Sequence, residues 1–223
     1  MSTLNYTAIA QRLTRDRLAS YLSSCSGDLT RAIELYDWNG AVGAAFHEDI
    51  GRLEVVLRNA LDETLVGYGT SQAWQSIWYR RPQLFPGGHG ARALMDINTA
   101  RRRASRPGSS EVHGKVIAEL SFGFWRYLCT KPYLTSLWVP ALAGAFVRHP
   151  QSGDARAIRQ SVEKNVERVH FLRNRIAHHE PIHRRDLQKD FDAIIEVADW
   201  ICGDTCDWIR STSRVPAVLR FRP

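Results

Sequence analysis

The chain has 223 residues, of which 44% are hydrophobic, 30 are Lys or Arg and 23 are Asp or Glu. This length and apolar content allow one packed domain over residues 1–223 and argue against global disorder. The formal net charge of +7 favours an anionic partner such as nucleic acid, because basic side chains near phosphates release counterions. Ordinary surface charge is the alternative explanation of this excess.

The four cysteines do not form a metal-site pattern. Cys202 and Cys206 are the one close pair, whereas Cys25 and Cys129 lie apart among apolar neighbours. Structural zinc sites usually draw on paired Cys or His clusters, so we expect free thiols in a reducing cytoplasm and no metal or cofactor. The N-terminus lacks the pattern of a secretory leader, and the apolar stretch 134–147 is too short to cross a bilayer. We therefore expect a cytoplasmic protein without membrane contact.

Apolar residues recur at helical spacing along the first half of the chain, and alternating strand patterns are scarce. An amphipathic helix is predicted over 6–22, and a second helix from Asp28, whose carboxylate can cap it, to Leu35. The residues Trp38-Asn39-Gly40 predict a break, after which Asn39 can cap a long helix over 42–66. The further elements expected are a helix end at 68–71, a short aromatic segment at 74–79, a loop at 80–90, a helix at 91–103 and a loop at 106–110.

The second half is also predicted to be helical. The segments 112–128 and 133–147 are apolar and aromatic, and Pro132 suits the first turn of the latter. Asp154 is expected to cap a helix that runs to about His179, and Pro181 stops this helix because proline disfavours helical geometry at the preceding residue. The last elements expected are a helix over 186–201, a final turn near Trp208, and an extended basic tail from Arg214 to Pro223, or 211–223 at its widest.

The segment from Phe171 to Pro181, FLRNRIAHHEP, carries the groups that side-chain catalysis of RNA cleavage requires. A guanidinium forks onto phosphate oxygens, and an imidazole with a pKa near 6.5 moves protons at neutral pH. Asn174 and His178 share a helix face, whereas Arg173 and His178 point about 140° apart and lie about 7.5 Å apart along the axis. Two copies that face each other could pair one arginine with the other histidine, which predicts a homodimer with a composite site.

Other interpretations of the same residues remain open. Arg173 and Asn174 could cap carbonyls at a helix end, and His178 and His179 could be ordinary surface residues. His178, His179 and His183 could form a zinc cluster, although they lack a carboxylate or cysteine in strong ligand spacing. If His178 is catalytic, the helix C-terminus favours its imidazolium form and an acid role, whereas burial would favour a base role.

The Arg-Asn-x-x-x-His motif that begins at Arg173 resembles that of HEPN ribonucleases, and its surroundings resemble the Abi-like (abortive infection) branch of that group. The resemblance spans about residues 18–185 and consists of four blocks, LYDWN from Leu35, LEVVLRNA from Leu53, ELSFGFW from Glu119 and LRNRIAHHEPI from Leu172. It implies an all-α fold, a HEPN-type helical bundle with additional helices, arranged as a two-fold homodimer with paired motifs in a cleft. It also implies a role in phage defence or in a toxin–antitoxin system.

The motif and the resemblance together predict a metal-independent endoribonuclease. His178 would take a proton from the 2′-hydroxyl or give one to the leaving 5′-oxygen, Arg173 would stabilise charge on the phosphate, and Asn174 would orient either group. Further RNA contacts or supporting roles are expected from other basic and amide residues, namely Arg58, Asn59, Arg175, His179, Arg101, Arg102 and Arg103. The alternatives are a non-catalytic RNA-binding or regulatory HEPN module and a structural protein whose motif stabilises a dimer.

The expected partners are an RNA substrate and an antitoxin made of RNA or protein. In HEPN proteins that pair with nucleotidyltransferase antitoxins, the motif resembles Arg-x4-His-x-Tyr, and the tyrosine is the residue that is modified. Glu180 occupies that position here, which argues against silencing by this modification. The Abi-like resemblance and the positive charge suggest a structured RNA as the other possible antitoxin.

Overall fold

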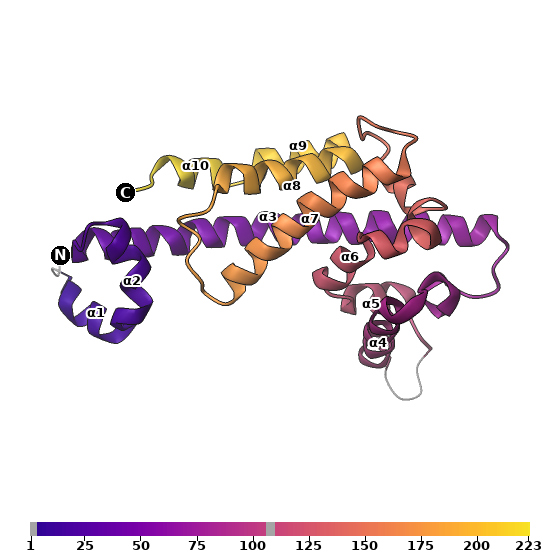
Figure 1. The fold of residues 1–223 in the computed structure, drawn as a ribbon, viewed down its shortest axis with the longest axis horizontal. Coiled ribbons are helices and arrows are strands. Elements are labelled where there is room, and N and C mark those ends of the chain that lie inside the picture. Colours follow the sequence, from indigo (N-terminus) through magenta and orange to yellow (C-terminus); the bar gives the residue numbers. More distant parts are fainter. Residues whose placement is uncertain (1–3, 106–109) are drawn as a thin grey trace.

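The structure, a computed structural model, describes residues 4–105 and 110–223, and this part of the chain is all-α without a β-strand (Figure 1). Its axis is α3 (Leu29–Ser71), a helix of 43 residues that runs along the length of the molecule. Most of the other helices pack along α3, whose inner face buries Leu53, Leu57, Leu61 and Leu65 completely. The all-α prediction is confirmed.

The remaining elements fall into three groups along α3. An N-terminal hairpin consists of α1 (Tyr6–Leu13) and α2 (Arg15–Ser24). A side lobe contains short turns at Trp78–Arg80 and Pro82–Leu84, followed by α4 (Gly87–Ala104), α5 (His113–Glu119) and α6 (Phe122–Leu128). After short turns at Lys131–Tyr133, Leu134–Trp138 and Leu142–Ala145, the chain continues with α7 (Ala155–Ala177), α8 (Leu187–Ile201), α9 (Gly203–Thr212) and α10 (Val215–Arg220).

The break predicted at residues 38–40 is wrong. The long helix α3 passes through these residues because both polar side chains there find distant partners. The Trp38 indole nitrogen donates to the Val218 carbonyl at 2.9 Å, and the Asn39 side chain binds the segment after α7 instead of capping a helix. Tertiary contacts therefore override the local turn signal of Asn-Gly.

Four other segments also differ from the predictions. The helix expected over 6–22 is interrupted at Thr14, which has a φ of 70° and whose hydroxyl caps α2. The loop expected at 80–90 is shorter, since α4 already begins at Gly87, and the segment 133–147 forms short turns rather than a long helix. The tail expected to be extended contains α10. The loop predicted at 106–110 lies largely outside the described residues.

Several local predictions are confirmed. The Asp28 carboxylate caps α3 by accepting from the Arg31 amide at 3.1 Å, and Asp154 caps α7 through two first-turn amides at 2.9 and 3.0 Å. The four cysteines are free thiols; Cys129 and Cys206 are buried, and the other two are partly exposed. In the part of the chain that the structure describes, no helix combines the length and apolar character needed to span a bilayer.

Helix α7 positions the motif. It packs against α3, α6 and α8, and its C-terminal half lies across α3 at the N-terminal end of α6 (Figure 1). Its inner stripe of Ile158, Val162, Val166, Val169 and Leu172 is buried, as the helical spacing predicts. The last turns of α7 therefore present their remaining residues to α3 on one side and to solvent on the other.

Candidate functional site

The motif forms the end of α7, and the predicted helix from Asp154 to about His179 is confirmed. Ala177 is the last helical residue, and His178 is the C-cap. The His179 amide donates to the Ile176 carbonyl at 3.0 Å, and the Glu180 amide donates to the Arg175 carbonyl at 2.7 Å. Together with the positive φ of 55° at His179, these bonds form a Schellman C-cap, which fixes the direction in which the chain leaves the helix.

Side chains on both sides hold this turn in place. Arg175 donates to the Pro181 carbonyl at 2.8 Å and pairs with the Glu180 carboxylate at 3.3 Å. Arg17 of α2 donates to the His179 carbonyl. Arg175 and the backbone of His179, both expected near RNA, are thus also part of the scaffold that orients His178.

Charged residues gather where α7 crosses α3. Burial raises the pKa of Glu54 above its ordinary value, while the nearby guanidiniums of Arg173 and Arg58 and the Phe122 amide oppose this rise. Glu54 is therefore within electrostatic range of an arginine of its own helix, Arg58, and of an arginine of the motif, Arg173. The Arg58 Nε is buried and has no hydrogen-bond partner among the described residues, whereas Arg173 is exposed. Arg58, which the sequence predicts only as a further RNA contact or supporting residue, thus shares the carboxyl of Glu54 with Arg173 of the motif.

His170 is a further member of this cluster that the sequence analysis missed. Burial lowers its pKa, and the guanidiniums of Arg126 and Arg173 lower it further. Its ring lies 5.9 Å from the Phe122 ring, and the Asn174 amide nitrogen lies 3.5 Å from a ring nitrogen. The lowered pKa keeps this imidazole neutral at pH 7, the form that can accept a proton. Its position one helical turn before Arg173 and Asn174 was the signal that could have revealed it.

The other predicted residues lie outside this cluster. His178 is exposed at the helix end, and its ring makes no hydrogen bond within residues 4–105 and 110–223. Asn59 is exposed on α3. Arg101, Arg102 and Arg103 belong to α4 in the side lobe, well separated from the end of α7 in Figure 1. Arg101 is paired with Glu111 at 2.7 Å.

The zinc interpretation gains no support. His183 is fully buried, packs against Tyr21 with ring centroids 4.6 Å apart, and its Nε2 lies 3.1 Å from the Ser24 hydroxyl. It therefore faces inward, while His178 and His179 are exposed. Across the described ranges, no three His, Cys, Asp or Glu side chains gather as a metal ion would require.

No protein-family model, curated protein or solved structure matches this chain. The clustered residues of the site form one unit at the crossing of α3 and α7, composed of Glu54, Arg58, His170, Arg173 and Asn174. We call this unit the crossing cluster. Its chemistry combines two guanidiniums, one carboxyl and one neutral imidazole, next to the exposed His178.

Proposed function

We propose that this protein is a metal-independent endoribonuclease that acts as a homodimer, in which Arg173 of one copy and His178 of the other form a composite site. The observation that carries the proposal is the crossing cluster, in which Glu54 lies near Arg58 and Arg173, and Arg173 also lies near the His170 imidazole. Guanidiniums bind phosphate oxygens in a forked geometry, and a neutral imidazole can accept a proton. The Abi-like resemblance supports a role as a phage-defence or toxin protein whose activity an RNA or protein antitoxin restrains.

In the proposed reaction, the RNA 2′-hydroxyl oxygen attacks the adjacent phosphorus and the bond to the 5′-oxygen breaks. His170 takes the 2′-hydroxyl proton, because its low pKa keeps it neutral beforehand. His178 donates a proton to the leaving 5′-oxygen from its exposed position at the C-terminal end of α7. Arg173 stabilises the charge on the pentacoordinate phosphate. The products are a 2′,3′-cyclic phosphate and a 5′-hydroxyl.

The need for two copies follows from helix geometry. Arg173 and His178 lie about 7.5 Å apart along the α7 axis and point about 140° apart, so one helix end does not aim both at one phosphate. A two-fold arrangement of two α7 ends can bring Arg173 of one copy next to His178 of the other.

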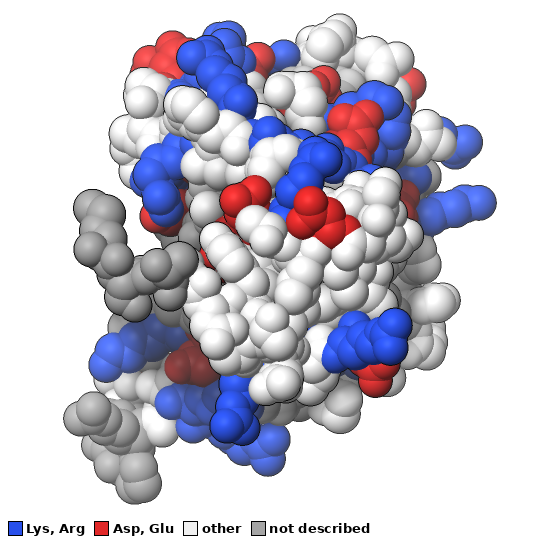
Figure 2. Space-filling view, turned by 90° about the vertical axis from the view of Figure 1, so that its left-hand side faces the viewer, with Lys and Arg blue, Asp and Glu red and all other residues white. Residues whose placement is uncertain are grey.

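Surface charge supports an RNA substrate. The chain carries a net charge of +7. In the view onto the end of the molecule that holds α1, α2 and the start of α3, Lys and Arg side chains, with some Asp and Glu among them, border a broad uncharged surface (Figure 2). Such a border suits a phosphate backbone that passes over an uncharged area where bases can lie.

A subunit-mixing experiment tests the composite site. Arg173→Ala and His178→Ala should each abolish RNA cleavage, because each removes one half of both sites. Mixing the two variants in equal amounts with subunit exchange should restore about a quarter of wild-type activity, since half of the dimers are mixed and each has one intact site. His89→Ala, which alters an exposed histidine on α4, serves as the control and should remain fully active.

The outcomes separate the candidate functions. Cleavage by either single variant alone overturns the proposed function. Salt-sensitive RNA binding by the wild type without cleavage would favour the non-catalytic RNA-binding module. Two inactive variants that stay inactive after verified exchange would contradict the composite arrangement.

A further inference from the structure

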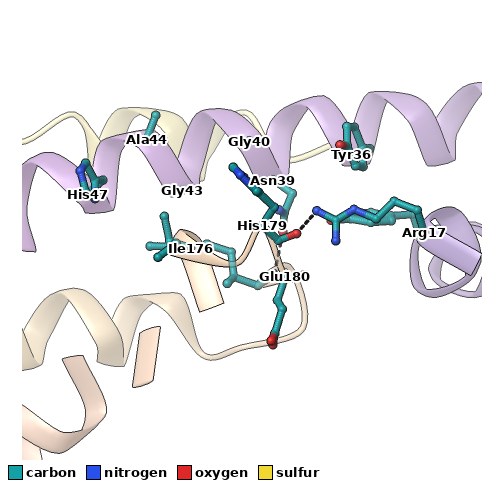
Figure 3. Close-up of a pocket in the computed structure, with 13 residues that line it drawn as sticks. Arg17, Tyr36, Asn39, Gly40, Gly43, Ala44, His47, Ile176, His179 and Glu180 are labelled. Carbon is teal, nitrogen blue, oxygen red and sulfur yellow. Dashed lines mark hydrogen bonds between the residues drawn. The ribbon is translucent and has the colours of Figure 1, made fainter. Parts of the chain in front are cut away.

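A half-open cavity of about 400 Å³ lies on the α3 side of the turn that follows α7 (Figure 3). One wall is the α3 segment from Tyr36 to His47, and the opposite wall is the chain from Ile176 to Ile182. Arg17 of α2 closes one side through its hydrogen bond to the His179 carbonyl. Sites for small organic ligands usually have volumes of about 300–1,000 Å³, so this cavity can hold one ligand of modest size.

Two glycines keep the α3 wall of the cavity bare. A Cβ atom on Gly40 would meet no heavy atom within 4 Å, and a Cβ atom on Gly43 would lie 3.9 Å from the Ile176 side chain. Glycine destabilises a helix interior relative to alanine. The two glycines therefore lower the stability of α3. At Gly40 this cost is not required by packing, because a larger side chain would fit there.

The inner wall contains an unsatisfied polar group. Tyr21 lines the cavity and is completely buried, yet its hydroxyl has no hydrogen-bond partner in the described part of the chain. Burial raises the pKa of Tyr21 to about 12, so the hydroxyl stays protonated and can donate. A buried hydroxyl without a hydrogen-bond partner carries an uncompensated desolvation cost. A ligand with a hydrogen-bond acceptor would offset this cost by accepting from the Tyr21 hydroxyl.

The rest of the lining favours a planar aromatic ligand that carries a negative charge. Tyr36 packs edge-on against Tyr21 and supplies a second aromatic ring beside the flat glycine wall. The Arg17 guanidinium retains N–H donors besides the one bound to the His179 carbonyl. The Glu180 carboxylate points away from α3 in Figure 3 and is paired with Arg175, so it opposes an anion in the cavity only weakly. A nucleobase joined to a phosphate has this combination of properties.

We propose that this cavity binds one base of the RNA substrate, next to the phosphate that is cleaved, and that Arg17 contacts a neighbouring phosphate. This inference rests on the proposed function. The cavity is connected to the motif because residues that line it flank His178 in the sequence. Ala177 and His179 both line the cavity, and His178 lies between them at the helix end. A base held in the cavity would therefore place the attached backbone beside His178 and select the nucleotide at the cut.

The binding test uses two matched glycine variants on α3. Gly40→Leu fills the cavity, whereas Gly51→Leu adds the same side chain at another exposed position where a Cβ also meets nothing within 4 Å. Calorimetric titration with the four nucleoside 5′-monophosphates should show binding of at least one by the wild type. Gly40→Leu should weaken that affinity about tenfold or more, and Gly51→Leu should leave it within about twofold. The inference is overturned if no mononucleotide binds, or if Gly40→Leu binds as well as the wild type.

The cleavage pattern then separates this inference from the proposed function. Wild type and Gly51→Leu should cut an RNA library with the same base preference at one position beside the cut, and Gly40→Leu should lose that preference. An unchanged preference in Gly40→Leu overturns the inference even if free nucleotides bind. His178→Ala should bind the mononucleotide like the wild type while losing cleavage. Retained cleavage in that variant together with Gly40-dependent binding refutes the proposed function but leaves a nucleotide site.

Discussion

Replacing Asn39 tests how the motif segment is attached to α3. The Asn39 side-chain oxygen accepts from the Ile182 amide at 2.8 Å and from the His183 amide at 3.1 Å. Both of these residues are buried, so the two amides have no easy access to water. In Asn39→Ala both donors lose their partner, and the segment that follows the α7 C-cap loses its main tie to α3.

The expected loss can be worked from those two bonds. Leaving one buried donor unsatisfied costs about 1–3 kcal/mol, so two amides that recover part of their hydration should cost about 2–4 kcal/mol in total. For a chain of this size, that corresponds to a fall in melting temperature on the order of 10 °C. Asn39→Asp keeps an acceptor for both amides and should recover part of the loss.

Urea unfolding followed by tryptophan fluorescence would measure this loss. Asp37→Ala changes an exposed side chain two residues earlier on α3 and should alter the free energy of unfolding by less than about 0.5 kcal/mol. If Asn39→Ala is no more destabilising than Asp37→Ala, the two hydrogen bonds do not anchor the segment and the reasoning is refuted.

Two further predictions concern stability. Asp190 is fully buried and paired with Arg168 at 2.6 Å and with Arg185 at 2.9 Å. Asp190→Ala should lower the free energy of unfolding in urea by about 2–4 kcal/mol. This loss is smaller than for an ion pair whose partners are all buried, because both arginines are partly exposed. Asp192→Ala is the exposed control, and equal effects would contradict the prediction. The free energy of unfolding should also fall as the pH drops below about 6.5, because buried histidines in the folded chain resist the protonation that the unfolded chain undergoes. Each such histidine contributes at most about 1.4 kcal/mol per pH unit. The histidines responsible are those whose pKa burial lowers, His149, His170 and His183. Asp49 and Glu54, whose pKa values burial raises, oppose this decline at lower pH. His183→Gln should flatten the decline between pH 7.5 and 5.5, and an unchanged slope would count against the assignment.

Much of the local structure could be predicted from the sequence because it depends on neighbouring residues. The caps at Asp28 and Asp154 and the end of α7 before Pro181 follow from side chains within three or four residues. The break expected at Trp38-Asn39-Gly40 is wrong because the partners of these side chains lie more than 140 residues away. Local signals do not reveal such contacts.

The same distinction applies to the candidate site. Arg173, Asn174 and His178 lie within six residues of one another and could be recognised as a motif. The grouping of Glu54 and His170 with Arg173 depends on how α7 crosses α3, which no local pattern encodes. The cavity beside the motif likewise requires α2, α3 and the turn after α7 together.

RNA cleavage in the presence of EDTA, with the chemistry of the new ends identified, tests the central claim most directly. Purified wild type should cut RNA into products that end in a 2′,3′-cyclic phosphate and begin with a 5′-hydroxyl. His178→Ala, shown by circular dichroism and size-exclusion chromatography to have the wild-type fold and oligomeric state, should leave the RNA intact. Equal cleavage by His178→Ala, or wild-type cleavage that EDTA abolishes, would contradict the account.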